Sequence, residues 1–361
     1  MDLLRRNLEA YLKGVYGRDL QLLCTRRMGE TIPTSEDVKG FGYGSPLLVE
    51  FQVKGKRGSA VLSTMRAQYG FGHDHFSDRA RIMIWQNATF SSLPKHVPSV
   101  DVGYFTEKGK LVSAGDAVEY FLLMEKVEGK EYFFDLDRVK DSGATDLDYD
   151  RTIALSDYLA EIHVVKNDCP PLYLRKIRET VGDGECIFGI LDDYPDNPSF
   201  LAEGELQEIE KVCVEWRWML RGRARRLCQV HGDFHPWNIM FRDGTDFTVL
   251  DRSRGEWGEA ADDVTALTMN YIFYSVQKSL RLTGDLKDLF ELFFENYLEK
   301  TGDEELLEVI APFFAFRATV VASPTWYPLL SDDVRRSIFN FLENVLASKK
   351  FNYRDVNSYL G

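Results

Sequence analysis

The segment VHGDFHPWNIMF, residues 230–241, places polar side chains that can accept protons or bind metal among apolar ones. Its residues His231, Asp233 and Asn238 belong to the pattern H-G-D-x-x-x-x-N, and the next strand-like run, FTVL, leads into Asp251. An aspartate can accept a proton from a hydroxyl, and an asparagine with a second aspartate can hold Mg²⁺, which prefers oxygen ligands. These residue types at this spacing are what phosphoryl transfer requires.

Two other interpretations of the same segment stay open. His231 and His235 are four residues apart, as two zinc ligands on one helix would be. However, Gly232 and Pro236 disfavour a helix at this point, and no third set of ligands stands out in the sequence. Alternatively, the polar groups only satisfy the backbone of a turn. The carboxylate of Asp251, which follows the next strand, favours phosphoryl transfer over both.

The composition is that of a folded, acidic protein. The 361 residues are 44% hydrophobic and 13% aromatic, which excludes a disordered chain and allows two or three domains or lobes. The 44 Lys and Arg are outnumbered by 57 Asp and Glu, which gives a net charge of -13. This balance disfavours non-specific binding to nucleic acid or to anionic membranes, so we expect neither as a partner.

The five cysteines never occur as C-x-x-C, which disfavours a disulfide framework and a four-cysteine zinc module. The first residues, MDLLRRNLEAYLKGVYG, are typical of an amphipathic helix and lack the uninterrupted apolar core of a signal peptide. No stretch of the sequence is long and apolar enough to cross a bilayer. We therefore expect free thiols and a cytoplasmic location.

The pattern of secondary structure changes along the chain. Residues from about 20 to 127 alternate as short strands do, and they predict a small antiparallel sheet that carries one helix. The expected elements are a hairpin of strands 46–53 and 59–66, a helix at 74–93, and a second strand pair formed by 97–113 and 119–127. From about residue 148 the spacing of apolar residues becomes helical, with helices expected at 148–166, 205–226 and within 264–351.

The helix expected at 205–226 ends in a basic run with four arginines within residues 221–226. Such a run could bind phosphate. Its charges could equally complement the negative end of the helix dipole, which is the plainer interpretation.

HGDFHPWNIMF followed by VLDRSRGEWGEAADDV resembles the hallmark of the aminoglycoside phosphotransferase and choline kinase superfamily, H-G-D-x-H-x-x-N with a later I-D-W and G-D-P-x-x-D. FLLMEKVEG is similar to the hinge of that family, and YLAEIH to the helix before its catalytic loop. The resemblance covers roughly residues 35–275 and is most specific at 230–264. It implies an α+β, two-lobed, protein-kinase-like fold. A small antiparallel sheet would form the N-terminal nucleotide-binding lobe, 1–127, and a mainly helical lobe, 128–361, would carry catalysis and substrate binding.

The resemblance also implies roles for the residues of the motif. Asp233 would be the catalytic base, and Asn238 and Asp251 would hold Mg²⁺. His231 would orient the backbone of the loop, and Asp263, which matches the late aspartate of the motif, would brace it.

For the nucleotide, the resemblance implies a phosphate-covering loop and a hinge. In the loop GFGYGSP, three glycines would let backbone amides approach the phosphates: Gly40, Gly42 and Gly44. In the hinge, the backbone of Glu125 and Val127 would bond adenine, with Met124 at the back of the pocket. The family's phosphate-binding lysine is missing from the third strand, SAVLSTMR, where Arg66 is the nearest cation.

Two arginines distinguish the chain from the family. The residue after the metal-binding aspartate is usually aromatic there, whereas here Arg252, Ser and Arg254 follow. The two arginines could contact the transferred phosphoryl group or an anionic substrate. They could equally pair with nearby acids: Glu256, Glu259 or Asp262.

The resemblance implies a small-molecule kinase that uses ATP or GTP with Mg²⁺ and phosphorylates a hydroxyl of its substrate. Few residues separate Asp251 from Asp263, which leaves little room for the long activation segment on which protein kinases dock a peptide. The segment 173–198 would either shape the acceptor pocket or simply connect helices.

Two alternatives to a small-molecule kinase stay open. One is a nucleotide-binding pseudokinase without turnover, since the strand lysine is missing, and the other is a metal-dependent hydrolase that uses His231, Asp233 and His235.

Overall fold

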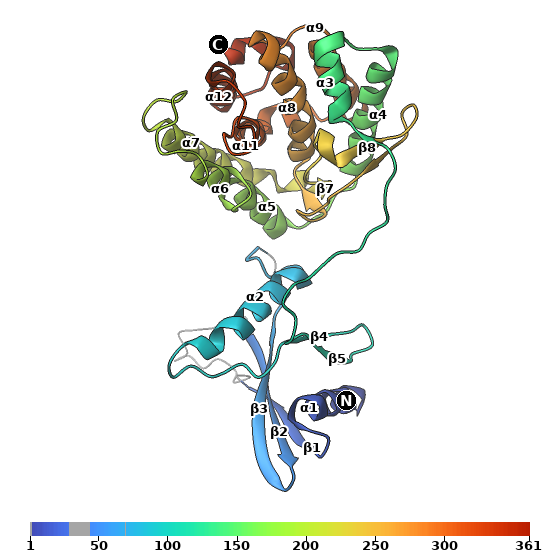
Figure 1. The fold of residues 1–361 in the computed structure, drawn as a ribbon, viewed down its shortest axis with the longest axis vertical. Coiled ribbons are helices and arrows are strands. Elements are labelled where there is room, and N and C mark those ends of the chain that lie inside the picture. The colour runs from blue at the N-terminus through green and yellow to red at the C-terminus, as the bar shows by residue number, and fades with distance from the viewer. Residues whose placement is uncertain (1, 29–43, 69) are drawn as a thin grey trace. The chain divides into compact units, whose positions relative to one another are not determined.

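The computed structural model describes residues 2–28, 44–68 and 70–361, which fold as two compact units. Unit 1 is Met1–Met124 and unit 2 is Glu125–Gly361 (Figure 1). The division falls inside the apolar run 119–127, at whose end the sequence analysis placed the boundary between the lobes. Each unit has a hydrophobic core of its own.

Unit 1 contains a three-stranded antiparallel sheet in the order β1-β2-β3. The strands are β1 (Gln21–Arg27), β2 (Gly44–Val53) and β3 (Lys56–Met65). The turn between β2 and β3 lies at Lys54 and Gly55, which both have positive φ, as a two-residue hairpin turn of type I′ requires. The predicted hairpin is therefore present, with a shorter turn than the sequence pattern indicated.

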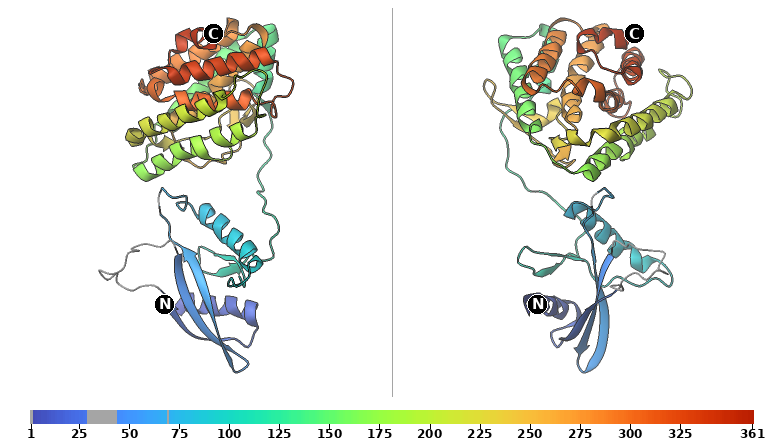
Figure 2. Two further views of the ribbon diagram at one scale, coloured as in Figure 1. Left: turned by 90° about the vertical axis from the view of Figure 1, so that its left-hand side faces the viewer. Right: turned by 180° about the vertical axis from the view of Figure 1, so that it is seen from behind.

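The first helix covers this sheet with its apolar side. The helical elements of unit 1 are α1 (Asp2–Tyr16), α2 (Phe76–Thr89) and the 3-10 turn η1 (Phe90–Ser92). Helix α1 lies against the strands of the sheet (Figure 2). Leu8 and Leu12 of α1 are buried in one cluster with Phe51 of β2. The ring of Tyr16 also packs on Phe51, with 4.6 Å between the ring centroids. These contacts join the first helix to the hairpin.

The end of unit 1 differs from the sequence prediction. Residues 97–113 do not form one strand but contain a short hairpin of β4 (Gly103–Phe105) and β5 (Leu111–Ser113). The chain turns at TEKGK, where Gly109 has a φ of 70° that suits glycine. The apolar run 119–127, expected as the partner strand, belongs to no strand. Strands β4 and β5 pair with each other, and neither pairs with this run in the described part of the chain.

Unit 2 is mainly helical, and α8 lies at the centre of its core (Figure 1). Its helices are α3 (Phe133–Ser142), α4 (Asp146–His163), α5 (Pro170–Gly182), α6 (Ile187–Asp192), α7 (Glu205–Leu220), α8 (Ala260–Ser279), α9 (Gly284–Thr301), α10 (Leu306–Val309), α11 (Ala311–Val321), α12 (Asp332–Ala347) and α13 (Asn357–Leu360), with 3-10 turns η2 (Arg221–Arg226), η3 (Pro236–Asn238) and η4 (Tyr353–Asp355). Almost all residues of α8 from Ala260 to Val276 are buried. Within residues 2–28, 44–68 and 70–361, no helix has both the length and the apolar character needed to span a bilayer.

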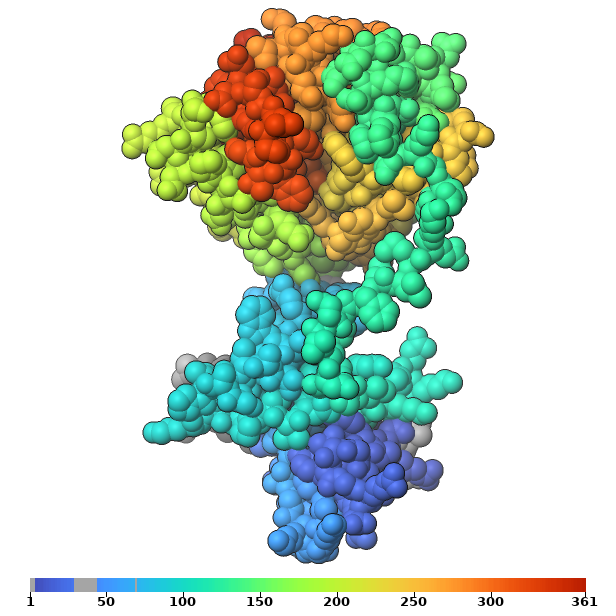
Figure 3. Space-filling view, viewed as in Figure 1, coloured from blue at the N-terminus to red at the C-terminus, as the bar shows by residue number. Residues whose placement is uncertain are grey.

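Segments far apart in the sequence meet around α8. Helix α11 contacts both α8 and α12, and α4 packs along α9. Helices α5 and α7 lie side by side (Figure 2), and α3 lies beside α9 on the face shown in Figure 3. The consequence for the site is that α11, near the C-terminus, reaches the start of α8.

Two small sheets hold the ends of the loop 230–238. Their strands are β6 (Lys130–Glu131), β7 (Cys228–Gln229), β8 (Ile239–Phe241), β9 (Phe247–Val249) and β10 (Trp257–Gly258). Strand β7 pairs with β10, and β8 lies between β6 and β9. The loop therefore leaves one paired strand and enters another, so its two ends are fixed.

Arg226 ties the start of α8 to the strand that leads into this loop. Its guanidinium, 5% exposed, donates to both carboxylate oxygens of Glu259 at 2.8–3.0 Å and to Asp303 at 2.6 and 2.8 Å. Glu259 directly precedes α8, and its side chain is fully buried. The neighbouring arginines of the run 221–226 pair with Glu305. Arg223, Arg225 and Arg226 of the basic run thus form ion pairs between elements, a role that the sequence pattern did not indicate.

Replacing Arg226 with alanine should destabilise unit 2 by about 3–5 kcal/mol, because the buried carboxylate of Glu259 loses its partner. Arg225→Ala is the matched control. The Arg225 side chain is 68% exposed, so its loss should cost less than about 1 kcal/mol. Urea unfolding of the full chain, followed by far-UV circular dichroism, measures both losses. Equal losses in the two variants would contradict the role given to Arg226.

Candidate active site

The backbone of the loop 230–238 is anchored to the first turn of α8. The carboxylate of Asp263 accepts hydrogen bonds from the N–H groups of His231 and Gly232, each at 2.7 Å. Nε2 of His163, from α4, lies 3.2 Å from the same carboxylate. Burial by itself raises the pKa of Asp263, but the hydrogen bonds from His163 and the backbone lower it overall, so the anchor stays charged.

Gly232 is required at its position for two reasons. Its φ is 89°, in the left-handed region that other residues rarely adopt. A Cβ at this position would lie 3.2 Å from Cβ of Arg254, so the two segments approach each other closely. This contact brings the segment after Asp251 against the residue that precedes Asp233.

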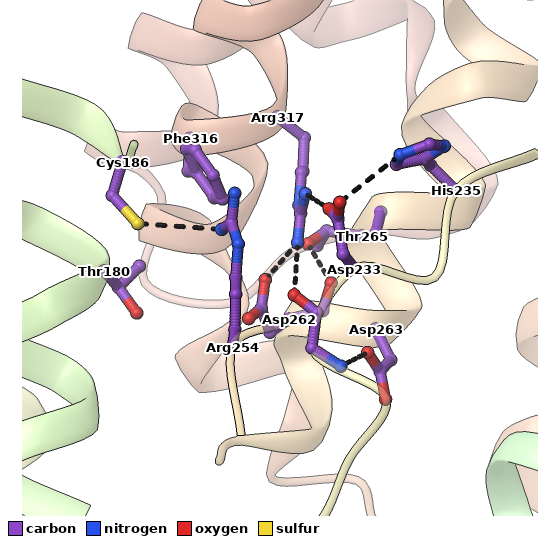
Figure 4. Close-up of polar contacts among 12 residues, drawn as sticks. Thr180, Cys186, Asp233, His235, Arg254, Asp262, Asp263, Thr265, Phe316 and Arg317 are labelled. Atoms are coloured by element: carbon purple, nitrogen blue, oxygen red, sulfur yellow. Dashed lines mark hydrogen bonds and ion pairs between the residues drawn. The ribbon is translucent and has the colours of Figure 1, made fainter. Parts of the chain in front are cut away.

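The carboxylate of Asp233 lies between an arginine and a histidine (Figure 4). Nη1 of Arg317, from α11, donates to Oδ1 of Asp233 at 2.6 Å, and Nε2 of His235 lies 3.3 Å from Oδ2. Nη2 of the same guanidinium donates to Oδ1 of Asp262 at 2.6 Å. The side chain of Arg317 is only 7% exposed. One buried cation therefore links a carboxylate of the loop to a carboxylate of α8.

The surroundings of Asp233 keep its carboxylate ionised. Burial by itself raises the pKa of Asp233, but the hydrogen bond with His235 and the charge of Arg317 lower it well below its usual range. Asp262 behaves in the opposite way, because burial raises its pKa more than Arg317 lowers it. Of the two carboxylates that bind Arg317, Asp233 is the one held in its charged, hydrogen-bond-accepting form.

Asn238 and Asp251 lie at the same end of the β8–β9 pair. The N–H of Leu250 donates to the carbonyl oxygen of Asn238 at 2.8 Å, so Asp251 is the next residue after this bond. Nδ2 of Asn238 donates to the backbone carbonyl of Asp233 at 3.0 Å. Within the described part of the chain, no group donates to Oδ1 of Asn238 or to the exposed carboxylate of Asp251. An amide and a carboxylate oxygen with no protein donor are the atoms that Mg²⁺ would take as ligands.

The two arginines after Asp251 do not pair with the acids considered from the sequence. Arg252 donates to the carbonyl oxygens of Val230 at 2.8 and 3.0 Å and of Glu256 at 3.1 Å. Arg254 donates to the carbonyl oxygen of Glu185 at 3.3 Å and to Sγ of Cys186 at 3.6 Å. The three candidate acids bind other groups: Glu256 accepts from Trp257, Glu259 from Arg226 and Asp262 from Arg317.

The histidines of the loop bind its backbone. Nδ1 of His231 accepts from the N–H of Asp233, and Nδ1 of His235 accepts from the N–H of Trp237, both at 3.3 Å. Burial lowers the pKa of His231 and so favours a neutral ring. Across the described residues, no group of three or more His, Cys, Asp or Glu is arranged to hold a metal ion. The structure therefore gives the zinc interpretation no support.

The residues expected to bind the nucleotide are only partly described. Gly40 and Gly42 lie outside the described residues, and Gly44 is the first residue of β2. Arg66 directly follows β3 and is exposed. The hinge residues lie on both sides of the division between the units, in a segment without helix or strand: Met124, Glu125 and Val127. Their roles stay predictions.

Sequence reasoning missed Arg317, the direct partner of Asp233. The two residues are 84 positions apart, and no motif connects them. One signal was available: Arg317 is the single charged residue in APFFAFRATVV, the sequence of α11. A lone arginine in an apolar helix is rarely buried unless it is paired, so it indicates an acidic partner elsewhere in the chain.

The low pKa of Asp233 has a consequence for stability against pH. Because its folded pKa lies below the unfolded value, its contribution is fully present above about pH 4 and is lost as the pH falls toward the folded pKa. The difference in unfolding free energy between the wild-type chain and Asp233→Asn should be constant from pH 5 to 7. Below about pH 4 it should shrink by up to about 1.4 kcal/mol per pH unit.

Urea unfolding across this pH range tests the prediction. The same pair of measurements in an Arg317→Met background should show a weaker pH dependence, since the cation that lowers the pKa is gone. A difference that does not vary with pH in either background would mean that Arg317 does not hold Asp233 in its ionised form.

The comparisons with known proteins agree with the motif. The sequence model of the phosphotransferase enzyme family matches residues 88–285, which include the loop 230–238 and the start of α8. No curated protein matches the chain by sequence.

Similar solved structures include three kinases. The amicoumacin kinase hAmiN, in complex with AMP-PNP, Ca²⁺ and Ami, has a TM-score of 0.43 and 14% identity, over 98% of this chain and 97% of that one. An ethanolamine kinase from Plasmodium vivax has a TM-score of 0.34 and 13% identity, over 95% and 80%. The choline kinase LicA from Streptococcus pneumoniae has a TM-score of 0.34 and 12% identity, over 95% and 99%.

The family match covers more than half of the 361 residues. It confirms the resemblance to aminoglycoside phosphotransferases and choline kinases, and with it the α+β, protein-kinase-like fold that the sheet of unit 1 and the helices of unit 2 display. The chain is a member of the phosphotransferase enzyme family.

Proposed function

We propose that this protein transfers the γ-phosphoryl group of ATP or GTP to a hydroxyl of a small molecule, with Asp233 as the base. The observation that carries the proposal is the ionised state of the Asp233 carboxylate. Its carboxylate is held ionised by Arg317 and His235, on a loop whose backbone is fixed by Asp263. A hydroxyl placed against it would find a fixed acceptor for its proton.

A carboxylate with a low pKa suits phosphoryl transfer. In a loose transition state the new O–P bond forms late, so the hydroxyl needs little help from a strong base early in the reaction. Asp233 would first orient the hydroxyl by accepting its hydrogen bond and would take the proton as the O–P bond forms. The bond from Arg317 to Oδ1 fixes the plane of the carboxylate, which leaves Oδ2, on the side of His235, for the substrate.

Asn238 and Asp251 would hold Mg²⁺ in the proposed reaction. Both offer oxygen atoms to which no group of the described residues donates, at the same end of the β8–β9 pair. Bound there with the nucleotide, Mg²⁺ would neutralise charge on the transferred phosphoryl group. The hydrogen bond from Asn238 to the backbone of Asp233 couples the metal ligand to the base, because moving one displaces the other.

For the nucleotide we propose the residues that the family resemblance implies. The glycines of GFGYGSP would cover the phosphates, and the hinge backbone at 125–127 would bond the base beside Met124. Arg66 would take the place of the missing strand lysine, since it follows β3 directly and is exposed. The pseudokinase alternative rests on the same missing lysine, so it must be separated from the kinase by turnover.

Asp233→Ala should reduce acceptor-dependent ADP release by about 10²–10⁴-fold, because the proton acceptor is lost. Nucleotide binding should persist. Asp246→Asn is the matched control, since Asp246 is exposed at the turn between β8 and β9 and its carboxylate forms its ion pair with the neighbouring Arg242. Activity is measured with a screen of sugars, amino alcohols, hydroxy amino acids and aminoglycosides, and binding by calorimetry with ADP. If neither the wild type nor the variant consumes ATP with any acceptor, the result would favour the pseudokinase.

Asp251→Ala should lower the affinity for Mg²⁺ in the presence of ATP by about tenfold or more, because the substitution removes a charged ligand. In the wild type, ATP with Mg²⁺ should raise the melting temperature more than ATP with EDTA does. In the variant, the two increases should be similar. Thermal unfolding at fixed ATP and increasing Mg²⁺ measures the effect. Stoichiometric zinc in the purified chain, with no Mg²⁺ effect on ATP binding, would point instead to the metal-dependent hydrolase.

A further inference from the structure

Arg254 is a half-buried cation that has no carboxylate partner among the residues the structure describes. Its guanidinium lies over the ring of Phe316, 4.7 Å from the centroid, and donates to Sγ of Cys186 (Figure 4). It also donates to the carbonyl oxygen of Glu185. Burial raises the pKa of Cys186 to about 12, so the thiol stays neutral near pH 7. In the part of the chain that the structure describes, Arg254 makes no ion pair. All of its contacts are therefore with neutral groups.

One acid close to this cation is already bound to another arginine. Asp262 is within electrostatic reach of Arg254, since the charge of Arg254 lowers the pKa of its carboxylate. However, Asp262 accepts a hydrogen bond at 2.6 Å from Arg317, which also donates to Asp233. The two carboxylates share one cation, and Arg254 is left with N–H donors that no carboxylate among the described residues accepts from.

Arg254 lies beside the proposed base. The ring of Phe316 contacts two guanidinium groups, that of Arg254 and, at 4.4 Å, that of Arg317. Arg317 in turn binds Asp233. The close approach of Arg254 to Gly232 gives a second, independent connection to the same loop.

The position of Arg254 is fixed from several sides. Nζ of Lys176, from α5, donates to its backbone carbonyl at 2.8 Å. The aromatic ring holds the planar guanidinium by a cation–π contact, and the backbone at Glu185 holds one edge. Because the side chain is already ordered, binding a ligand to it costs little additional conformational entropy.

We propose that Arg254 binds an anionic group, a carboxylate or a phosphate, on the acceptor alcohol whose hydroxyl lies at Asp233. A planar guanidinium with free N–H donors matches such a group in shape and charge. The segment 173–198, which contributes Glu185 and Cys186, then forms part of the acceptor site. The proposal rests on the kinase function proposed above and names its substrate class.

The test compares alcohols that differ in charge. The probes are glycerate and glycerol 3-phosphate against glycerol, gluconate against sorbitol, and glucuronate against glucose and glucosamine. Each is given to the full chain with ATP and Mg²⁺, and ADP release is followed. The anionic member of each set should have the higher kcat/KM. Arg254→Met should reduce that advantage by about tenfold or more, through the KM of the acceptor and not the KM of ATP.

Two further variants sharpen the result. Arg254→Lys keeps the charge and should retain part of the preference for anionic alcohols. Arg242→Met is the matched control, because Arg242 is on the same lobe but pairs with Asp246. Its preference should equal that of the wild type.

Several outcomes would overturn the proposal while leaving the kinase intact. One is a preference for neutral or cationic alcohols that Arg254→Met leaves unchanged. Another is an equal loss of kcat in Arg254→Met for every acceptor and for ATP hydrolysis without acceptor, which would assign Arg254 to the transferred phosphoryl group. By contrast, no ADP release with any acceptor, in wild type or Asp233→Ala, would count against the kinase function.

If no probe is phosphorylated, binding measurements test the proposed anionic site instead. The same alcohols are titrated by calorimetry into the chain loaded with ADP and Mg²⁺. Binding of the anionic members alone, lost in Arg254→Met, would support the anionic site. Failure of every anionic member to bind would overturn it.

Discussion

The geometry of the site depends on one buried cation. Arg317 is bound between Asp233 of the loop and Asp262 of α8, and neither carboxylate has another arginine or lysine partner within the described residues. A buried arginine is stable only when it is paired, and each carboxylate in turn is easier to bury beside it. The packing of α11 against α8 therefore sets both the position and the charge of the proposed base. The same helix supplies Phe316, so it also positions Arg254.

Three acidic residues at the start of α8 connect the segments that form the site. Glu259, Asp262 and Asp263 follow each other closely in the sequence, and each binds a different part of unit 2: Arg226 before β7, Arg317 of α11, and the backbone of the loop. Acidic residues are favoured at this end of a helix by its dipole. Three carboxylates at one helix terminus thereby join the strand before the loop, the loop itself and a distant helix, and the loop is held more rigidly than a surface turn would be.

The sequence predicted those parts of the fold and the site that depend on local patterns. The β2–β3 hairpin and the helices α4 and α7 follow from the spacing of apolar residues and from turn residues. The prediction of a strand at 119–127 was wrong, because an apolar run forms a strand only where a neighbouring strand pairs with it, and β4 and β5 pair with each other. The shared ring of Phe316 and the buried pairs of Arg226 could not be predicted, since they join residues that only the packing of helices brings together.

The sequence by itself determined which polar residues of the proposed site stand close together along the chain: an aspartate and an asparagine of one loop and an aspartate after the next strand. It did so because the spacing of Asp233, Asn238 and Asp251 is a property of one short loop and one strand pair. Only the tertiary structure decided the charges around that loop. Arg317 reaches Asp233 from 84 residues away, and Arg254 has no carboxylate partner within the described residues, since Asp262, which its charge reaches, binds Arg317. Electrostatic pairing depends on distance in space, which local sequence patterns do not specify.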